Sequence, residues 1–268
     1  MQNLHSHTVY CDGSLTLDEM VRAAISKGCS SFGFSGHSYA PFDIKGCMDP
    51  ETTLRYAKEI GELKEIYSGQ IELFTGIERE YHGDAVDINV DYTIGSVHYI
   101  KKGDAYISID SSAEEFTSGC ETFFNGDYYA MAEYYYDAAS HVATETQADF
   151  IGHFDIFSKF NFGGSLFDES HPRYVGAALA AMDEIMKACN LFEVNTAPIF
   201  KYGKPEPYPS VRLLKALRER GGEVLITSDS HNAESICYMF DEMREMLKSC
   251  GFKYMKRLTP GGFVDVAL

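Results

Sequence analysis

The chain has 268 residues, too many for a disulfide-stapled miniprotein, and its 45% hydrophobic and 24% charged residues are typical of a chain that buries a large core. Asp and Glu number 40 against 23 Lys and Arg, so the formal charge of −17 argues against nonspecific binding to nucleic acid or anionic lipid. No apolar stretch approaches the roughly 20 residues of a membrane helix, and the first residues do not resemble a signal peptide. Seven widely spaced cysteines predict free thiols and a cytoplasmic protein.

Short β-rich runs alternate with helical patterns, without a linker or internal repeat that would divide the chain. In chain order, the predicted elements are a strand from Leu4, a helix over 16–28, a strand over 32–35, a helix over 49–69, strands over 71–77 and 92–97, a mostly helical Tyr-rich section over 103–147, a strand over 150–152, a helix from Pro172, a strand over 191–195, a helix from Ser210 to 221–222, a strand over 224–227, a helix from Asn232 to Lys248, and a strand-like tail. Seven strands separated mainly by helices predict one α/β domain over residues 1–268, with a parallel sheet that is open or closed into a barrel.

Histidines and acidic residues follow the predicted strands. They are His5-Ser6-His7, Gly36-His37, Glu78, His98, His153 and Asp229-Ser230-His231, which together hold six of the nine histidines. Because the carboxyl ends of parallel strands meet on one face, these side chains are expected to converge in one pocket. Imidazoles and carboxylates are the natural ligands of zinc, iron or manganese. The recurrence therefore predicts a metal cluster.

Each of these residues also has an ordinary structural explanation when taken alone. The two imidazoles of His5 and His7 share one side of an extended segment and could grip one metal, but a surface or structural role is equally open. Asp12 could be a turn residue, and His37 or His98 could be hydrogen-bonded core histidines. The metal hypothesis depends on all of them occurring together.

Several other catalytic motifs are absent from the sequence. It contains no GxxxxGK[ST] phosphate loop, no GxGxxG, no GxSxG elbow and no HExxH. Nucleophilic catalysis by Cys11 is disfavoured, because no neighbouring group is identified that would stabilise a thiolate.

The chain resembles the polymerase and histidinol phosphatase (PHP) superfamily, whose motifs occur here in the same order. These motifs are His5-Ser6-His7 with Asp12, Gly33-Phe34-Ser35-Gly36-His37, Gly76-Ile77-Glu78, Gly95-Ser96-Val97-His98, Gly152-His153-Phe154-Asp155 and Ser228-Asp229-Ser230-His231. Within the superfamily, other stretches look like histidinol-phosphate phosphatases of histidine biosynthesis. They are 5–13, Ala40-Pro41-Phe42, Lys159-Phe160, Phe192-Glu193-Val194-Asn195-Thr196 and Glu206-Pro207-Tyr208-Pro209-Ser210.

The resemblance implies a distorted (β/α)7 barrel, similar to a TIM barrel, with three divalent ions of zinc, iron or manganese. His5, His7, Glu78 and Asp229 would share the first ion, Glu78 would bridge to a second held by His98 and His153, and the third would be held by Asp12, His37 and His231. Glu80 does not match the motif and is expected to support a ligand from behind.

The resemblance also implies a reaction, namely hydrolysis of a small phosphomonoester, most specifically L-histidinol phosphate, by a metal-activated hydroxide. The residues expected to act in it are Asp12, Glu78, Asp229 and His231. Lys159 and Lys201 stand near positions where the family often has Arg on the phosphate, and solvated surface lysines are the alternative. Four acidic residues are candidates by position for holding the cationic groups of the substrate, namely Asp43, Glu80, Asp155 and Glu193.

Two other functions remain open at this stage. One keeps the metals and changes the substrate to nucleotides or other phosphate esters, although no basic stripe with interleaved aromatics favours long nucleic acid. The other is a metal-binding module without activity. The oligomeric state is not predicted, and the Tyr-rich segment 116–136 could serve as a lid, as core packing or as a dimer contact.

Overall fold

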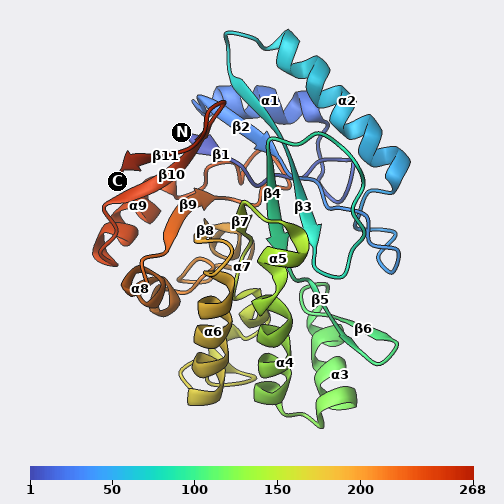
Figure 1. The fold of residues 1–268 in the computed structure, drawn as a ribbon, viewed down its shortest axis with the longest axis vertical. Coiled ribbons are helices and arrows are strands. Elements are labelled where there is room, and N and C mark those ends of the chain that lie inside the picture. Colours follow the sequence, from blue (N-terminus) through green and yellow to red (C-terminus); the bar gives the residue numbers. More distant parts are fainter.

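The computed structural model describes residues 1–268 and contains a seven-stranded parallel sheet that curls into a nearly closed barrel (Figure 1). In sheet order the strands are β1 (Gln2–Asn3), β2 (Ser31–Phe34), β3 (Glu72–Glu80), β4 (Tyr92–Ser96), β7 (Phe150–Ile151), β8 (Leu191–Asn195) and β9 (Glu223–Thr227). The two sheet edges meet just beyond β1 and β9, where the His7 amide donates to the Ser230 carbonyl at 2.8 Å and the Ser230 amide donates to the His5 carbonyl at 3.1 Å. The α/β class and the barrel are thus confirmed.

Nine α-helices accompany the barrel. Below the barrel in Figure 1, α4 lies between α6 and α3 and packs against both. They are α1 (Leu17–Ser26), α2 (Pro50–Ile66), α3 (Ala113–Phe124), α4 (Tyr128–Ser140), α5 (Val142–Thr146), α6 (Pro172–Ile185), α7 (Ala197–Tyr202), α8 (Val211–Glu219) and α9 (Phe240–Ser249). The chain also has short 3₁₀ turns over Ile156–Ser158 and Phe162–Gly164, and two hairpins, β5 (Tyr99–Lys102) with β6 (Ala105–Ser108) and β10 (Tyr254–Thr259) with β11 (Gly262–Ala267). None of the helices combines the length and apolar composition needed to cross a bilayer.

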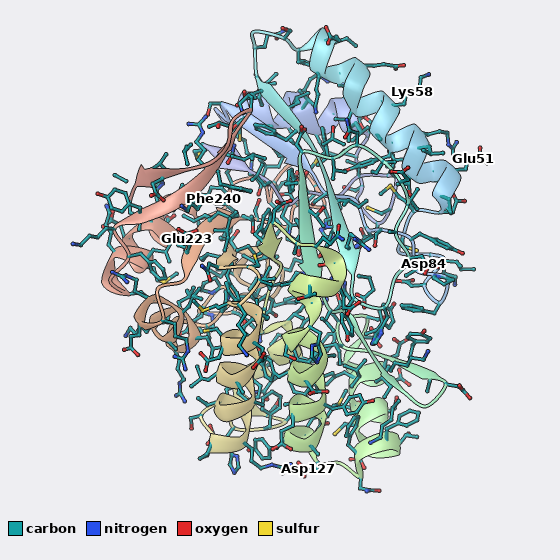
Figure 2. All side chains as sticks on the ribbon, in the orientation of Figure 1. Glu51, Lys58, Asp84, Asp127, Glu223 and Phe240 are labelled. Carbon is teal, nitrogen blue, oxygen red and sulfur yellow. The ribbon has the colours of Figure 1, made fainter.

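Local sequence signals explain where the first two helices begin. The Thr16 hydroxyl accepts the Glu19 amide at 3.3 Å, and the Glu19 carboxylate accepts the Thr16 amide at 2.9 Å, which completes a capping box at α1. At α2, Asp49 accepts the Thr52 amide at 2.7 Å, and Pro50 occupies the first turn, where no amide hydrogen is needed. Glu51 and Lys58 mark the exposed side of α2 (Figure 2).

Most barrel strands are short and buried on both faces, as a parallel sheet covered by helices requires, whereas β3 is longer and carries charged residues. Every residue of β2, β4 and β8 is buried. The larger of two apolar clusters contains 46 buried residues and includes Phe116, Met131, Tyr135 and Tyr136. Of the roles considered for the Tyr-rich segment, core packing therefore accounts for its buried aromatics.

The section over 103–147 is mostly helical, as predicted, because α3, α4 and α5 fill most of it, but it begins with the turn of the β5–β6 hairpin, where Gly103 adopts a φ of 64°. Other parts of the predicted secondary structure are wrong. The first strand ends at Asn3, before its predicted start at Leu4. The Asn232 side chain accepts the Ser235 amide at 3.0 Å, as a cap would, but the residues that follow form turns, and α9 begins only at Phe240. Helix α7, next to the pocket, was not predicted at all.

Candidate metal centre

The structure brings all nine predicted ligands to the carboxyl end of the barrel. Their ligand atoms form four overlapping groups, each with all atoms within 4.8 Å of one another. The groups are His5, His7 and Asp229; His5, Glu78 and His153; His37, Glu78 and His98; and His7, Asp12, His37 and His231. Residues up to 226 positions apart in the chain therefore share one pocket, because each follows or ends a neighbouring strand.

Four atoms at the bottom of the site are buried and have no hydrogen-bond partner: His5 Nε2, His7 Nε2, Glu78 Oε2 and Asp229 Oδ1. His5 Nε2 lies 3.1 Å from Glu78 Oε2. His7 Nε2 lies 3.4 Å from the same oxygen and 3.2 Å from Asp229 Oδ1. Ligands of one tetrahedral zinc ion, each about 2.1 Å from it, stand roughly 3.4 Å apart. The spacing and the missing partners therefore fit a divalent ion.

A second group surrounds the other oxygen of Glu78. His153 Nε2 is 2.9 Å from Glu78 Oε1, His98 Nε2 is 3.4 Å from it, and the two imidazole nitrogens are 3.1 Å apart. The two carboxylate oxygens of Glu78 thus face different sets of imidazoles, the arrangement that a bridging carboxylate requires.

The third group lies closer to solvent. His231 Nε2 is 3.1 Å from Asp12 Oδ2, and His37 Nε2 is 3.7 Å from Asp12 Oδ1. The other ring nitrogen of His37 lies 3.1 Å from Glu78 Oε2, so this imidazole also borders the first group. Asp229, which precedes Ser230 and His231, adopts a φ of 45°, and such left-handed backbone at a non-glycine residue is typical of functional sites.

Two buried carboxylates hold the imidazoles from behind. Glu193 lies 2.8 Å from His5 Nδ1 and accepts the His153 amide at 2.5 Å, while Glu80 lies 3.0 Å from His98 Nδ1. Such partners fix the ring orientation and leave Nε2 free for a metal. The supporting position expected for Glu80 fits this contact. The signal for Glu193 was its place as the lone charge in the buried strand Leu191–Asn195.

The predicted rim for a cationic substrate is only partly present. Asp43 and Glu80 line the central cavity, whereas Glu193 and Asp155 do not. Glu193 is 0% exposed because it faces His5. Asp155 is 1% exposed and accepts the Ser210 amide at 2.9 Å, and burial raises the pKa of its carboxyl to about 7. For these two residues the rim interpretation is wrong.

The pKa values of the site residues depend on burial and on the charged groups packed around them. Burial alone would raise the pKa of Glu78, but the surrounding His5 and His37 hold it well below its usual value. For His98, burial lowers the pKa and nearby Glu78 and Asp110 raise it, with a net rise to about 10. Burial next to the other imidazoles lowers the pKa of His7 to about 3. The ionised carboxylates at the base of the pocket are thus stabilised by nearby positive charge, which either protonated imidazoles or bound cations can supply.

The ligand cluster forms the floor of a cavity of about 610 Å³. Lys159 and Lys201 both line it, but each already has a neighbour: the Lys159 ammonium donates to the Asp110 carbonyl at 2.6 Å, and Lys201 Nζ lies 3.2 Å from His231 Nδ1. Sequence reasoning missed Asp110 and Glu115 in this lining, and it gave no role to the buried Tyr208, although Tyr208 stands in the stretch 206–210 that resembles histidinol-phosphate phosphatases. Only the three-dimensional arrangement of hairpin β5–β6, α3 and the segment after α7 brings them there.

Comparison with known proteins places this geometry in context. Residues 3–197 match the family described as PHP domain. A Deinococcus radiodurans relative named "Probable histidinol-phosphatase" is 28% identical over 264 residues, covering 92% of each chain.

Two solved structures share the fold. A Listeria monocytogenes protein superposes with a TM-score of 0.76 at 19% identity, covering 90% of this chain and 99% of that one. Histidinol phosphate phosphatase from Lactococcus lactis, in complex with zinc, L-histidinol and phosphate, gives a TM-score of 0.66 at 18% identity and covers 98% of both chains.

Proposed function

The chain belongs to the PHP domain family, and from this membership we propose that it is a metal-dependent phosphatase that hydrolyses L-histidinol phosphate to L-histidinol and inorganic phosphate. The observation that carries the metal dependence is the set of four buried, converging ligand atoms without hydrogen-bond partners, on His5, His7, Glu78 and Asp229. Burying such groups unpaired is costly, and a divalent cation removes that cost. The named relatives and the zinc complex of the Lactococcus protein support the substrate.

We assign the ligands to three ions. His5, His7, Glu78 and Asp229 hold the first, Glu78 with His98 and His153 the second, and Asp12, His37 and His231 the third. Histidine and carboxylate donors without thiolate suit zinc, iron or manganese. When bound, divalent ions supply a water that is nucleophilic near neutral pH and positive charge for the phosphoryl oxygens.

The protein's own residues then divide the work. Glu78 and Asp229 contribute the negative charge that retains the ions, and Glu193 and Glu80 fix the imidazoles. Asp12 and His231 line the cavity 3.1 Å apart, and by holding the third ion there they would place positive charge beside the departing alkoxide.

The lysines in the lining suit the phosphate group. Lys201 is exposed next to His231, and Lys159 lies across the same cavity. Either ammonium can attract a phosphate oxygen as a point charge. Asp43, Asp110 and Glu115 in the same lining leave an acidic part of the cavity for the amino group of a substrate such as histidinol phosphate.

We propose that the protein acts in the cytoplasm. All seven cysteines are free thiols in the structure, and free thiols are typical of proteins in a reducing compartment.

The experiment is phosphate release from L-histidinol phosphate, phosphoserine, AMP and a single-stranded oligonucleotide, with and without a chelator. We expect chelator-sensitive turnover and a kcat/KM for histidinol phosphate far above the others. Preference for AMP or the oligonucleotide would overturn the substrate and keep the metal assignment. No turnover of any substrate by metal-replete protein would favour a metal-binding module without activity.

Variants separate phosphate binding from general charge effects. Lys159→Ala and Lys201→Ala should each raise KM by about tenfold, the value of one lost charged hydrogen bond. Lys58→Ala, on the exposed side of α2, removes the same charge far from the cavity and should change neither constant. Equal kinetics in all three variants would remove both lysines from the phosphate site.

A further inference from the structure

Strand β3 carries a cation that the proposed reaction does not use. Glu78 and Glu80 line the central cavity, whereas Arg79 between them lines a different one. This follows from strand geometry, because successive side chains point to opposite faces. Arg79 therefore leaves the barrel on its outer side.

The second cavity, here called the Arg79 cavity, measures about 180 Å³. It exists because β3 and β4 are joined by a segment over 81–91 that contains no helix, so a loop covers the barrel here. Asp84, labelled in Figure 2, marks this segment on the outside of the molecule. The apolar lining consists of Ile77, Ala85, Val86, Ile88 and Val90, and the polar lining of Ser38, Tyr39, Thr53, Arg79, Thr93 and Gln147.

The Arg79 guanidinium is half-buried and has no carboxylate within 4 Å, although the chain has 40 acidic residues. Its one hydrogen bond is donated to the Thr146 carbonyl at 2.9 Å. Burial lowers the pKa of Arg79, but a guanidinium still remains charged. The remaining donors of this guanidinium are not among the buried atoms without a partner, so they reach solvent and stay free to bind an anion that enters the cavity.

We propose that the Arg79 cavity binds a small monocarboxylate with a short, branched apolar chain. The planar guanidinium matches a carboxylate in a two-point contact, and the aliphatic walls match the chain. The Arg79 cavity is large enough for a ligand about the size of benzene, which binds in a cavity of about 150 Å³ in another protein. Of the residues that line the central cavity, only Ser38 also lines this one, so the site is separate from the metal centre.

The test is titration of the metal-loaded protein with isovalerate by calorimetry, in saturating inorganic phosphate so that the metal centre is blocked. We expect saturable binding of one isovalerate per chain in the millimolar range. Isovaleramide, which lacks the charge, should bind about tenfold more weakly, as expected from loss of one charged contact. Acetate, which lacks three carbons of the apolar chain, should bind roughly 50-fold more weakly, as expected from loss of three buried CH₂ groups.

Arg79→Gln should weaken isovalerate binding by about tenfold, while Arg22→Gln on the exposed side of α1 should leave it unchanged. Because position 79 adjoins metal ligands, Val86→Phe provides a second variant, which fills the cavity from the loop and should also abolish binding at an unchanged melting temperature. Absence of saturable binding, isovalerate binding that phosphate displaces, or equal affinity in Arg79→Gln would each overturn the proposal.

Discussion

At the scale of single residues, Glu193 shows how the centre depends on groups that touch no substrate. Its carboxylate also accepts the Thr227 hydroxyl at 2.7 Å and the Asn195 amide at 2.8 Å, so its position behind His5 is fixed from several sides. A buried acid held this firmly keeps the imidazole in one tautomer and orientation.

Glu193→Gln should therefore lower metal affinity by roughly 10- to 100-fold while the fold persists, because the amide keeps the shape but loses the charge behind His5. Metal affinity can be measured by competition with a chromophoric chelator. Glu184→Gln, which changes an exposed partner of Lys187, serves as the control and should bind metal normally. Normal affinity in Glu193→Gln would contradict the orienting role.

Asp155 gives a prediction about pH. Its pKa is raised by burial to about 7 from an ordinary 3.8, so the folded protein keeps this proton between those values while the unfolded chain releases it. The folded state then binds more protons than the unfolded state, and the contribution of Asp155 to stability falls as pH rises, by about 1.4 kcal/mol per pH unit near pH 5 and by about half of that at pH 7.

Asp155→Asn removes this slope, and its side-chain oxygen can still accept the Ser210 amide. Relative to wild type, the variant should thus gain about 2 kcal/mol of unfolding free energy from pH 5 to pH 7 in urea titrations. Because other groups titrate equally in both proteins, parallel curves would mean that Asp155 is already ionised in the folded state.

At the scale of elements, the predictable parts are those decided by neighbours in the chain. The Thr16 and Asp49 caps lie within three residues of their partners, and both helices begin where the sequence indicated. In contrast, Ser210 precedes α8 but makes no side-chain cap, and its amide donates instead to the distant Asp155. The segment after Asn232 likewise turns instead of forming helix, and no local pattern distinguishes the two outcomes.

The capping box at α1 can be tested alone. Thr16→Ala removes the acceptor of the Glu19 amide and should cost about 1 kcal/mol of unfolding free energy. Thr16 is exposed and lines none of the central cavity, so kcat and KM should not change. Chemical denaturation together with steady-state kinetics checks both statements, and an unchanged midpoint would show that the cap contributes nothing.

The positions of the candidate ligands could likewise be predicted from the sequence, whereas the residues that hold these ligands from behind could not. The convergence of the candidate ligands could be predicted because they lie at or beyond the carboxyl ends of parallel strands, and a parallel sheet brings such positions together whatever the loops do. The roles of Glu193 and Asp110 could not, because an acidic residue that holds an imidazole or an ammonium resembles one that faces substrate until distances are known. The cavity beside Arg79, on the outer side of β3, depends on the absence of a helix between β3 and β4. No sequence motif predicts that absence.

At the scale of the whole molecule, charge links folding to metal. The formal charge is −17, and five carboxylates, those of Asp12, Glu78, Glu80, Glu193 and Asp229, are concentrated around one cluster of imidazoles. Cations bound there neutralise the cluster in the folded state only, because the unfolded chain scatters the ligands along its length. Bound metal should therefore stabilise the whole fold.

A chelator should accordingly lower the melting temperature by about 10 °C, the shift for loss of about 4 kcal/mol from a ligand at a thousandfold its dissociation constant. Restoring zinc or manganese should reverse the change, as calorimetry or circular dichroism can measure. In Glu78→Gln the chelator effect should shrink, since the bridging oxygens are weakened, whereas Glu62→Gln on the exposed side of α2 should keep it. A melting temperature that is the same with chelator, with metal and in both variants would mean that the carboxylate cluster holds no structural cation.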